Sequence, residues 1–536
     1  MCDSVNIFKT CRRPSWLIRL SILSALCLSM VLSSSCGTGP GGADIADDGI
    51  SPPPPIVVFD TTEPVHQIWM VPGEKPQDLG AVFAVVNETL KKEINTTIEL
   101  KHLPWQVWSS QMETLLSAAN PPDALYVSAW ANYGKLAAAN LLMAVDTDML
   151  SRYAPKMAEG LSAYSANGLR DCEVAGKAYM VPAVGNLWVK DWPVLIRGDL
   201  RAKYGLAEIR TLDDLEAYMK ALSGPGSGII PWNADGNSLV AYLQVAWFQP
   251  SGMEALMAEF PFLAYKVGDK KAEVKIVLED KTFSDVLLRL HSLAVAGALP
   301  ENVLYERTPA VEKWEKGESA CLIADLETVS TAYDVTMRDH PEWKPERCLL
   351  NPDAKRQKQP LNQQGMAIPV GAAEPERFLM ALDLLYGTKT LQDLTLAGLP
   401  GTHREAGSGN AYIPGAEAAK YPFNGAGTWA WENRALMMAP SVNGWYLKEL
   451  FDKWTAEKDR VVEAELAAFQ FDPTPVSLQL TALQSAMNTE GRFLLAGVSD
   501  TVSTDMKTLQ DAFVKAGIED VRLEMQRQAD LFLKGR

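Results

Sequence analysis

Residues 62–128 alternate between strand-type and helix-type patterns, and this alternation limits the possible folds more than any other feature. Short β-prone runs occur at residues 66–71, 97–102 and 124–128. Between them lie residues 82–94, whose apolar side chains recur at helical spacing, and a second helical segment at residues 111–119. This order predicts an α/β fold with a mainly parallel sheet and helices on both of its faces.

In such sheets, ligands bind beside the loops that follow the carboxyl ends of the strands. The corresponding loops are residues 72–75, 104–105 and 129–133. Two of them carry a tryptophan, and the first carries an acid. Glu74, Trp105 and Trp130 are therefore candidate ligand-binding residues.

Residues 1–35 have the anatomy of a secretory signal peptide. Four basic residues precede a short apolar run at residues 22–32, and three serines then lead to Cys36. The apolar run is shorter than the ~20 residues that a membrane-spanning helix needs. A cysteine directly after small residues resembles the lipobox of bacterial lipoproteins, which implies that Cys36 is lipidated. The alternative is an ordinary signal peptide with an incidental cysteine.

The next segment, residues 36–56, is rich in glycine and proline and is expected to be a tether. The chain that follows is long enough for two domains. A formal net charge of −16 argues against a nucleic-acid partner, because phosphate binding needs a basic patch, and favours a soluble monomer. Beyond Cys36 only Cys172, Cys321 and Cys348 remain, so at most one disulfide can form.

Several segments resemble the extracellular solute-binding proteins of bacterial ABC importers. They are a proline-ended strand at residues 180–183, a strand and short helix at 194–206, and helix–strand patterns at 283–299, 311–323 and 364–385. Residues 429–433 and 515–530 resemble the carbohydrate-associated lipoprotein branch of that family. The resemblance covers residues 62–536. It departs from the family pattern at Arg404, where an aromatic residue is usual, and at Glu432, where a glycine is usual.

This resemblance implies two α/β lobes joined by crossing segments, with a ligand cleft between them. Lobe 1 is expected to comprise residues 62–183 and 362–400, and lobe 2 residues 187–358 and 401–536. The crossings are expected near residues 182–186, 357–364 and 399–403. A ligand that touches both lobes favours the closed form, which an ABC permease in the membrane then recognises.

The abundance of tryptophan favours a carbohydrate ligand. Aromatic rings cover the apolar faces of sugars, and the chain has 15 tryptophans, as many as phenylalanines. The tryptophans in expected loops or at strand ends are Trp105, Trp130, Trp188, Trp232, Trp429 and Trp431. Since tryptophan is often buried, about half of these are expected to be structural. Trp69, Trp247, Trp314 and Trp445 are assigned to packing.

Polar side chains near the expected cleft are the second group of candidates. Asp325 and Glu327 follow an apolar strand and could accept sugar hydroxyls, or they lie in a solvated loop. Asn186 lies at the first crossing and is either a ligand contact or a turn residue. His403 and Arg404 are candidates at the third crossing.

A glycosidase also needs tryptophans and two carboxylates, so composition alone does not exclude an enzyme. The sequence nevertheless lacks H-E-x-x-H, G-x-S-x-G and C-x-x-C motifs, and its five histidines are scattered. We therefore expect a non-enzymatic lipoprotein without cofactor or metal, anchored at the extracytoplasmic face of the cell membrane. Two alternatives remain open: the same fold binding a peptide or polyamine, and a surface adhesion or sensor lipoprotein.

Overall fold

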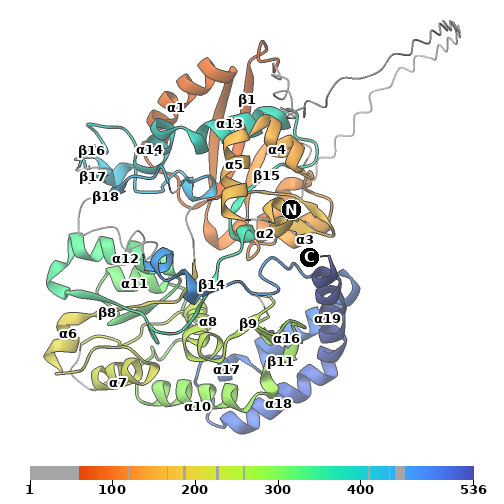
Figure 1. Ribbon diagram of the computed structural model, residues 1–536. Coiled ribbons are helices and arrows are strands. Elements are labelled where there is room, and N and C mark those ends of the chain that lie inside the picture. The colour runs from red at the N-terminus through yellow and green to blue at the C-terminus, as the bar shows by residue number, and fades with distance from the viewer. Residues whose placement is uncertain are drawn as a thin grey trace, which may run out of the picture. The chain divides into compact units, whose positions relative to one another are not determined.

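The computed structural model describes residues 59–118, 120–165, 167–184, 189–224, 228–257, 260–407, 411–433, 435–440 and 453–535. Residues 58–536 form one compact unit with two large hydrophobic cores, which we assign to lobe 1 and lobe 2 (Figure 1). The expected signal peptide, the expected tether and Cys36 lie outside the described residues. Among the helices that are described, none has the length and apolar character to cross a bilayer.

A five-stranded sheet with the strand order β2-β1-β3-β15-β6 forms the centre of lobe 1. The strands are β1 (Val65–Pro72), β2 (Thr96–Leu103), β3 (Ala124–Val127), β6 (Val181–Pro182) and β15 (Gly365–Ala367). β1 pairs in parallel with β2, with Val65 opposite Thr96, and in parallel with β3, with Trp69 opposite Ala124. β15 runs antiparallel to both β3 and β6. The mainly parallel sheet expected from the sequence is therefore confined to the first three strands of this lobe.

Helices cover this sheet because each has one apolar face. In α1 (Leu79–Ile94) the buried residues include Val82, Val86 and Leu90, at the spacing that puts them on one side. The other helical elements and the small hairpin strands of lobe 1 are α2 (Trp105–Leu116), α3 (Tyr133–Ala138), α4 (Thr147–Tyr153), α5 (Pro155–Tyr164), η1 (Gly168–Cys172), β4 (Glu173–Val174), β5 (Lys177–Ala178), η5 (Leu361–Gln363), α13 (Pro375–Gly387) and α14 (Lys389–Ala397).

A later segment of the chain returns to the lobe 1 core. Tyr421, Ala426, Ala430 and Trp431 pack with the side chains of β1 and α13. The division made from the sequence placed residues 401–536 in lobe 2, whereas these four side chains belong to the first core. The elements of this region are β16 (Arg404–Ala406), β17 (Ala411–Pro414), η6 (Ala418–Lys420), η7 (Thr428–Ala430) and β18 (Ala439–Pro440).

Lobe 2 has its own core, built around the three-stranded sheet β12-β8-β13. Both outer strands are antiparallel to the central one, so β12 and β13 run in the same direction. The strands are β8 (Val194–Arg197), β12 (Cys321–Ile323) and β13 (Pro345–Cys348), and a second small sheet contains β9 (Met253–Ala255), β10 (Leu263–Lys266) and β11 (Lys275–Ile276). Cys321 is buried in β12, as its apolar surroundings predict.

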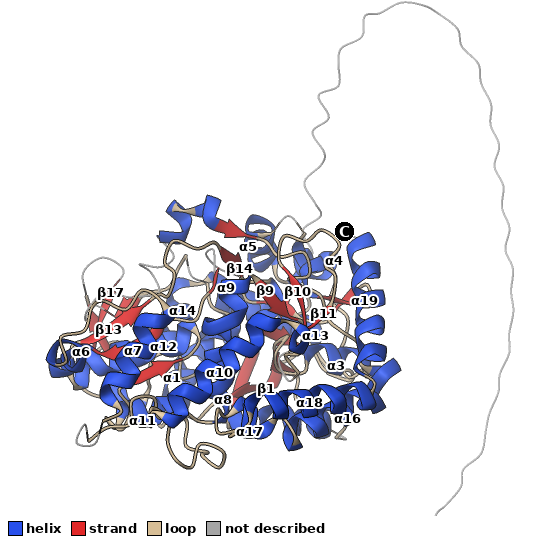
Figure 2. Ribbon diagram, turned by 90° about the horizontal axis from the view of Figure 1, so that it is seen from below, coloured by secondary structure: helices blue, strands red, loops and turns tan. Residues whose placement is uncertain are grey.

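Helices surround these sheets, and α10, α17 and α18 cover the side of lobe 2 seen in Figure 2. The first group is α6 (Gly198–Lys203), α7 (Leu212–Leu222), α8 (Gly236–Leu243), η2 (Gln244–Phe248), α9 (Gln249–Ser251), η3 (Val277–Glu279), α10 (Lys281–Val295), α11 (Ala310–Glu315), α12 (Leu326–Asp339) and η4 (Pro341–Trp343). The carboxyl-terminal group is η8 (Lys458–Arg460), η9 (Thr474–Val476), α16 (Ser477–Thr489), α17 (Arg492–Leu495), α18 (Val502–Ala516) and α19 (Ile518–Lys534).

Three short strands from distant parts of the chain meet where the chain passes between the lobes. They are β7 (Val189–Lys190), β14 (Arg356–Lys358) and β19 (Val461–Val462), in the order β19-β14-β7. We call them the hinge sheet. Asp191, directly after β7, and Arg356 of β14 form a buried ion pair of 2.9 Å within this sheet. The Arg356 guanidinium also donates to the Leu350 carbonyl of lobe 2 at 2.9 Å, which holds the sheet to that lobe. A second pair joins Lys190 to Glu254 of β9.

The Asp191–Arg356 pair is expected to be the costliest ion pair to break by a single substitution. Arg356→Met leaves the carboxylate of Asp191 buried without its cation, which should lower the free energy of unfolding by about 3–5 kcal/mol. The matched control is Arg527→Met, which removes an exposed partner of Glu524 on α19 and should leave the free energy of unfolding nearly unchanged. Urea denaturation measures both. Equal losses would mean that the buried pair does not anchor the hinge sheet.

Candidate functional site

Four aromatic side chains of lobe 1 gather at the carboxyl ends of β2 and β3. We call Trp105, Tyr126, Trp130 and Trp429 the aromatic wall. The ring centroid of Trp105 lies 5.6 Å from that of Trp130 and 5.5 Å from that of Trp429. Tyr126 packs edge-on against Trp429 at 4.5 Å. Trp105 and Trp130 remain 45% and 48% exposed, although each is large enough to be a core residue.

Local sequence explains how each ring reaches this place. Trp105 is the first residue of α2, and Pro104 before it fixes an extended backbone that ends β2. The sequence had placed Trp105 in a loop and the helix six residues later. The β1 loop approaches its ring, because a side chain at Gly73, where φ is +116°, would lie 3.7 Å from the indole nitrogen.

The other two indoles are held by short turns. The backbone N–H of Trp130 donates to the Ser128 hydroxyl at 3.2 Å, directly after β3. Trp429 lies in η7, where the neighbouring Thr428 hydroxyl donates to the Thr395 carbonyl of α14 at 2.7 Å. All three rings are therefore positioned by local turns and helix starts of lobe 1.

An exposed aromatic surface of this kind is typical of binding sites. Indole rings offer a broad apolar face and a polar N–H at the edge, so they fit ligands with alternating C–H faces and hydroxyl edges. Among the described residues, no group of three His, Cys, Asp or Glu side chains is placed to hold a metal ion.

One acidic group of lobe 2 acts on the aromatic wall. Burial raises the pKa of the Tyr126 phenol, and the negative charge of Glu327, in the first turn of α12, raises it further. Burial lowers the pKa of His102, whose Nε2 lies 3.1 Å from the Gly425 carbonyl. Glu74 is exposed in the loop after β1.

Two of the candidate tryptophans are core residues. Trp232 is fully buried in lobe 2, with its ring 5.5 Å from that of Tyr242. Trp431 is fully buried in lobe 1, 5.9 Å from Trp69. The expectation that these two contact a ligand is corrected, because apolar packing covers both rings. Trp69, Trp247 and Trp314 are buried, as the sequence predicted, and Trp445 lies outside the described residues.

Asp325 and His403 have structural partners. The Asp325 carboxylate caps α12, accepting the N–H groups of Glu327 and Thr328 at 3.0 Å each. The His403 ring is 1% exposed; its Nδ1 accepts the Leu399 N–H at 3.0 Å, and its Nε2 lies 3.1 Å from an Asp78 oxygen. The expectation that His403 lines the cleft is therefore corrected.

Arg404 is half-buried in β16 and donates to the Gly398 carbonyl at 3.1 Å. Asn186 and Trp188 lie outside the described residues. The sequence analysis did not select Tyr126, which packs against Trp130 and Trp429. The signal that could have identified it is its place near the carboxyl end of β3, four residues before Trp130.

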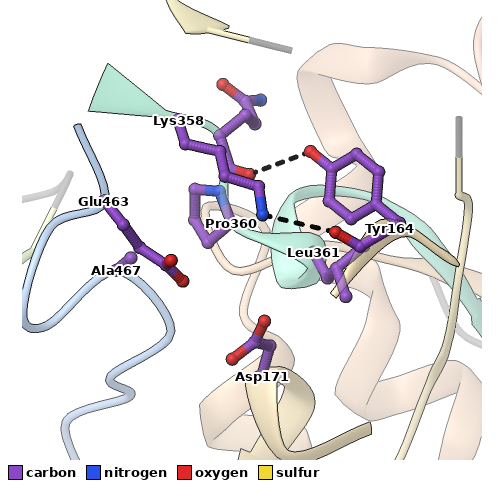
Figure 3. Close-up of a pocket in the computed structure, with 8 residues that line it drawn as sticks. Tyr164, Asp171, Lys358, Pro360, Leu361, Glu463 and Ala467 are labelled. Carbon is purple, nitrogen blue, oxygen red and sulfur yellow. Dashed lines mark hydrogen bonds between the residues drawn. The ribbon is translucent and has the colours of Figure 1, made fainter. Parts of the chain in front are cut away.

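A small pocket lies beside the second crossing, with room for about one water molecule. It is lined from lobe 1 by Tyr164 and Asp171, and from the crossing by residues 358–361. Figure 3 shows the Tyr164 hydroxyl donating to the Gln359 carbonyl at 3.3 Å and the Lys358 ammonium donating to the Tyr164 carbonyl at 3.4 Å. The pocket is too small for a sugar and belongs to the crossing.

Comparison with known proteins supports the reading of this fold. A family model described as a domain of unknown function (DUF3502) matches residues 465–534. A carbohydrate ABC transporter substrate-binding protein of Streptococcus pneumoniae serotype 4 is 20% identical over 483 residues, covering 88% of this chain and 92% of the relative.

Two solved structures extend this similarity. The N-glycan transport solute-binding protein (NgtS) of Streptococcus pneumoniae superposes with a TM-score of 0.71 at 19% identity, over 88% of this chain and 99% of that one. The alginate-binding protein AlgQ2 superposes with a TM-score of 0.62 at 15% identity, over 87% and 98%.

The fold is therefore that of two-lobed solute-binding proteins, an α/β fold whose lobes are joined by crossing segments. Within that class the chain resembles the carbohydrate substrate-binding proteins of ABC transporters, which confirms the resemblance that its sequence motifs indicated.

The burial of the tryptophans predicts which substitutions damage the fold. Trp431→Ala removes a fully buried ring and should lower the free energy of unfolding by about 3–5 kcal/mol. Trp130→Ala removes a half-exposed ring and should cost about 1 kcal/mol or less. Chemical denaturation followed by circular dichroism tests both values. A large loss for Trp130→Ala would assign that ring to packing rather than to binding.

Proposed function

We propose that this protein is a membrane-anchored substrate-binding lipoprotein that captures a carbohydrate, most simply an oligosaccharide, and delivers it to an ABC transporter permease. The ligand lies on the aromatic wall of lobe 1, and lobe 2 closes over it. The aromatic wall is the observation that carries this proposal.

Two indoles, those of Trp130 and Trp429, have ring centroids 5.6 and 5.5 Å from that of Trp105, and such a row matches a ligand that offers several apolar faces in succession. A chain of sugar rings has such faces, whereas a single small polar solute does not. The names of the relatives point the same way: those of known structure include proteins solved in complex with Man5GlcNAc and with kestose. In this proposal the protein binds and releases its ligand without altering it chemically.

Closure brings lobe 2 groups to the ligand. Glu327 of lobe 2 contributes to the raised pKa of Tyr126 in the wall, and Glu74 is exposed in the loop after β1, which supports both as ligand contacts. Their carboxylates accept hydrogen bonds from sugar hydroxyls. Since only a ligand in contact with both lobes favours closure, Glu327 contributes to the closed form and the aromatic wall to the first encounter.

The anchor follows from the amino-terminal sequence. Lipidation at Cys36 holds the protein at the outer face of the membrane, and residues 36–56 give the body freedom to reach a permease. This arrangement keeps captured ligand close to the transporter.

Binding to the aromatic wall is tested first with Man5GlcNAc, kestose and alginate oligosaccharides, together with a peptide and a polyamine. One sugar class should bind, with a change in tryptophan fluorescence. Trp105→Ala and Trp130→Ala should each weaken that binding about tenfold or more, which corresponds to about 1.4 kcal/mol of lost stacking. Isothermal calorimetry measures the dissociation constants.

The matched control is Trp343→Ala. Trp343 precedes β13. Its ring centroid lies 4.3 Å from the guanidinium carbon of Arg197 and 4.1 Å from the ring centroid of His340. β12 and β13 run in the same direction; Glu327 follows the carboxyl end of β12, whereas Trp343 precedes the amino end of β13. The two residues therefore lie at opposite ends of the lobe 2 sheet. This variant should bind normally. Binding of the peptide or polyamine alone would overturn the carbohydrate proposal and keep the fold, and no binding at all would favour a surface adhesion or sensor role.

The anchor is tested separately. Cys36→Ala should move the protein from the membrane fraction to the soluble extracytoplasmic fraction and abolish incorporation of labelled palmitate. Cys27→Ala, within the apolar run, is the control and should leave both unchanged. Retention of the Cys36→Ala protein on membranes would contradict the lipid anchor without affecting the assignment of the ligand.

A further inference from the structure

Asn362 is a fully buried polar residue at the second crossing, and it contacts both lobes at once. It belongs to η5, between the hinge sheet and β15. Its main-chain carbonyl accepts the Ala129 N–H at 2.8 Å, and its side-chain amide donates to the Ala468 carbonyl at 3.2 Å. Its side-chain oxygen accepts from Gln363 at 3.2 Å.

The main-chain contact reaches the aromatic wall. Ala129 precedes Trp130, and the Trp130 turn is closed by the bonds of Ala131 and Tyr133 to the Ser128 carbonyl, at 2.9 and 3.1 Å. The bond from Ala129 to Asn362 thus ties the start of that turn to the crossing. No side chain contributes to this tie, so substitution of Asn362 leaves it in place.

The side-chain contact reaches lobe 2. Ala468 is itself buried, and its neighbours Leu466 and Phe469 belong to the lobe 2 core. The Leu466 N–H donates to the Tyr265 hydroxyl of β10 at 3.1 Å, which fixes this segment to lobe 2. Two residues further on, Gln470 lies against α3: a side chain at Gly134 would come within 3.1 Å of its amide oxygen.

We propose that Asn362 is a positioning residue that couples the movement of lobe 2 to Trp130 and thereby sets the affinity of the aromatic wall. The proposal rests on the carbohydrate-binding function proposed above. A rotation of lobe 2 displaces the segment that contains Ala468. Either Asn362 moves with this segment, or the hydrogen bond from the Asn362 amide to the Ala468 carbonyl breaks. In the first case the displacement passes to Ala129 and to the Trp130 turn.

A broken bond at this place is costly, because both Asn362 and Ala468 are shielded from water. The favoured response is therefore concerted movement of the crossing, the turn and the segment around Ala468. Gln470 adds a second, weaker contact between the same segment and the helix that follows the turn.

The experiment uses the full chain with Asn362→Ala and two readouts. The first is acrylamide quenching of Trp130 in ligand-free protein, taken as the difference from the same variant carrying Trp130→Phe. The crossing, and the Trp130 turn tied to it, lose their bond to the Ala468 segment in this variant and are less restrained, so quenching of Trp130 should rise at least twofold. The second is the dissociation constant for Man5GlcNAc, which should increase about five- to tenfold, since one buried hydrogen bond no longer supports the bound geometry.

Asn87→Asp is the matched control. The Asn87 side-chain amide is bonded to β2, away from the crossing. It donates to the Ile98 carbonyl at 2.9 Å and accepts the Ile98 N–H at 2.8 Å. This variant should lose stability without altering Trp130 quenching or affinity. If Asn362→Ala does not fold, Gln470→Ala should give the same two changes at smaller size.

The outcomes separate the two proposals. Unchanged Trp130 quenching in Asn362→Ala, or an equal change in Asn87→Asp, would overturn the coupling role whatever the ligand is. A wild-type protein that binds no sugar but whose Trp130 quenching depends on Asn362 would overturn the carbohydrate function and leave the coupling supported.

Discussion

The buried ion pair between Asp191 and Arg356 is the interaction on which the relation of the two lobes depends. It joins the end of β7 to the start of β14 within the hinge sheet. The same two side chains also bond lobe 2, since Arg356 donates to the Leu350 carbonyl and Asp191 accepts from Gln249 of α9, so the three strands behave as an extension of that lobe. Deformation is then left to the residues between the hinge sheet and the five-stranded sheet of lobe 1. The Tyr164, Gln359 and Asn362 contacts all lie in this short interval. A rigid anchor on one side and a few hydrogen bonds on the other make a defined axis of movement.

The proposed binding surface, the aromatic wall, is positioned by a few neighbouring elements of lobe 1. β2 and β3 are parallel neighbours of β1, so their carboxyl ends lie at one edge of the sheet, and Trp105 and Trp130 follow those ends directly. The third ring, Trp429, comes from a segment that leaves lobe 1 and returns to it. Its place depends on the bond of Thr428 to α14 and on burial of Trp431 beside Trp69. Burial of Trp431 thus fixes the backbone that positions Trp429 two residues earlier.

Much of this arrangement could be predicted from the sequence. β1, β2, β3 and α1 follow from periodicity, and Trp105, Trp130 and Trp429 from their places after strands or in loops. Trp232 and Trp431 could not be separated from them, because a loop position does not tell which way a ring points. His403 was misassigned for a similar reason: its partner Asp78 lies 325 residues away in the chain. The helix expected at residues 111–119 begins at Trp105 instead, because Pro104 precedes the first helical residue and does not belong to a longer loop.

All four rings of the aromatic wall belong to a single lobe, and this has a kinetic consequence. In the proposed binding mode the ligand settles on lobe 1 before the other lobe moves, so the rate of association is governed by a surface that is already formed. The lifetime of the complex is governed instead by how readily the second lobe reopens. Substitutions in lobe 2 should therefore act on dissociation, and a permease that pries the lobes apart would release the ligand without having to disturb the surface that first captured it.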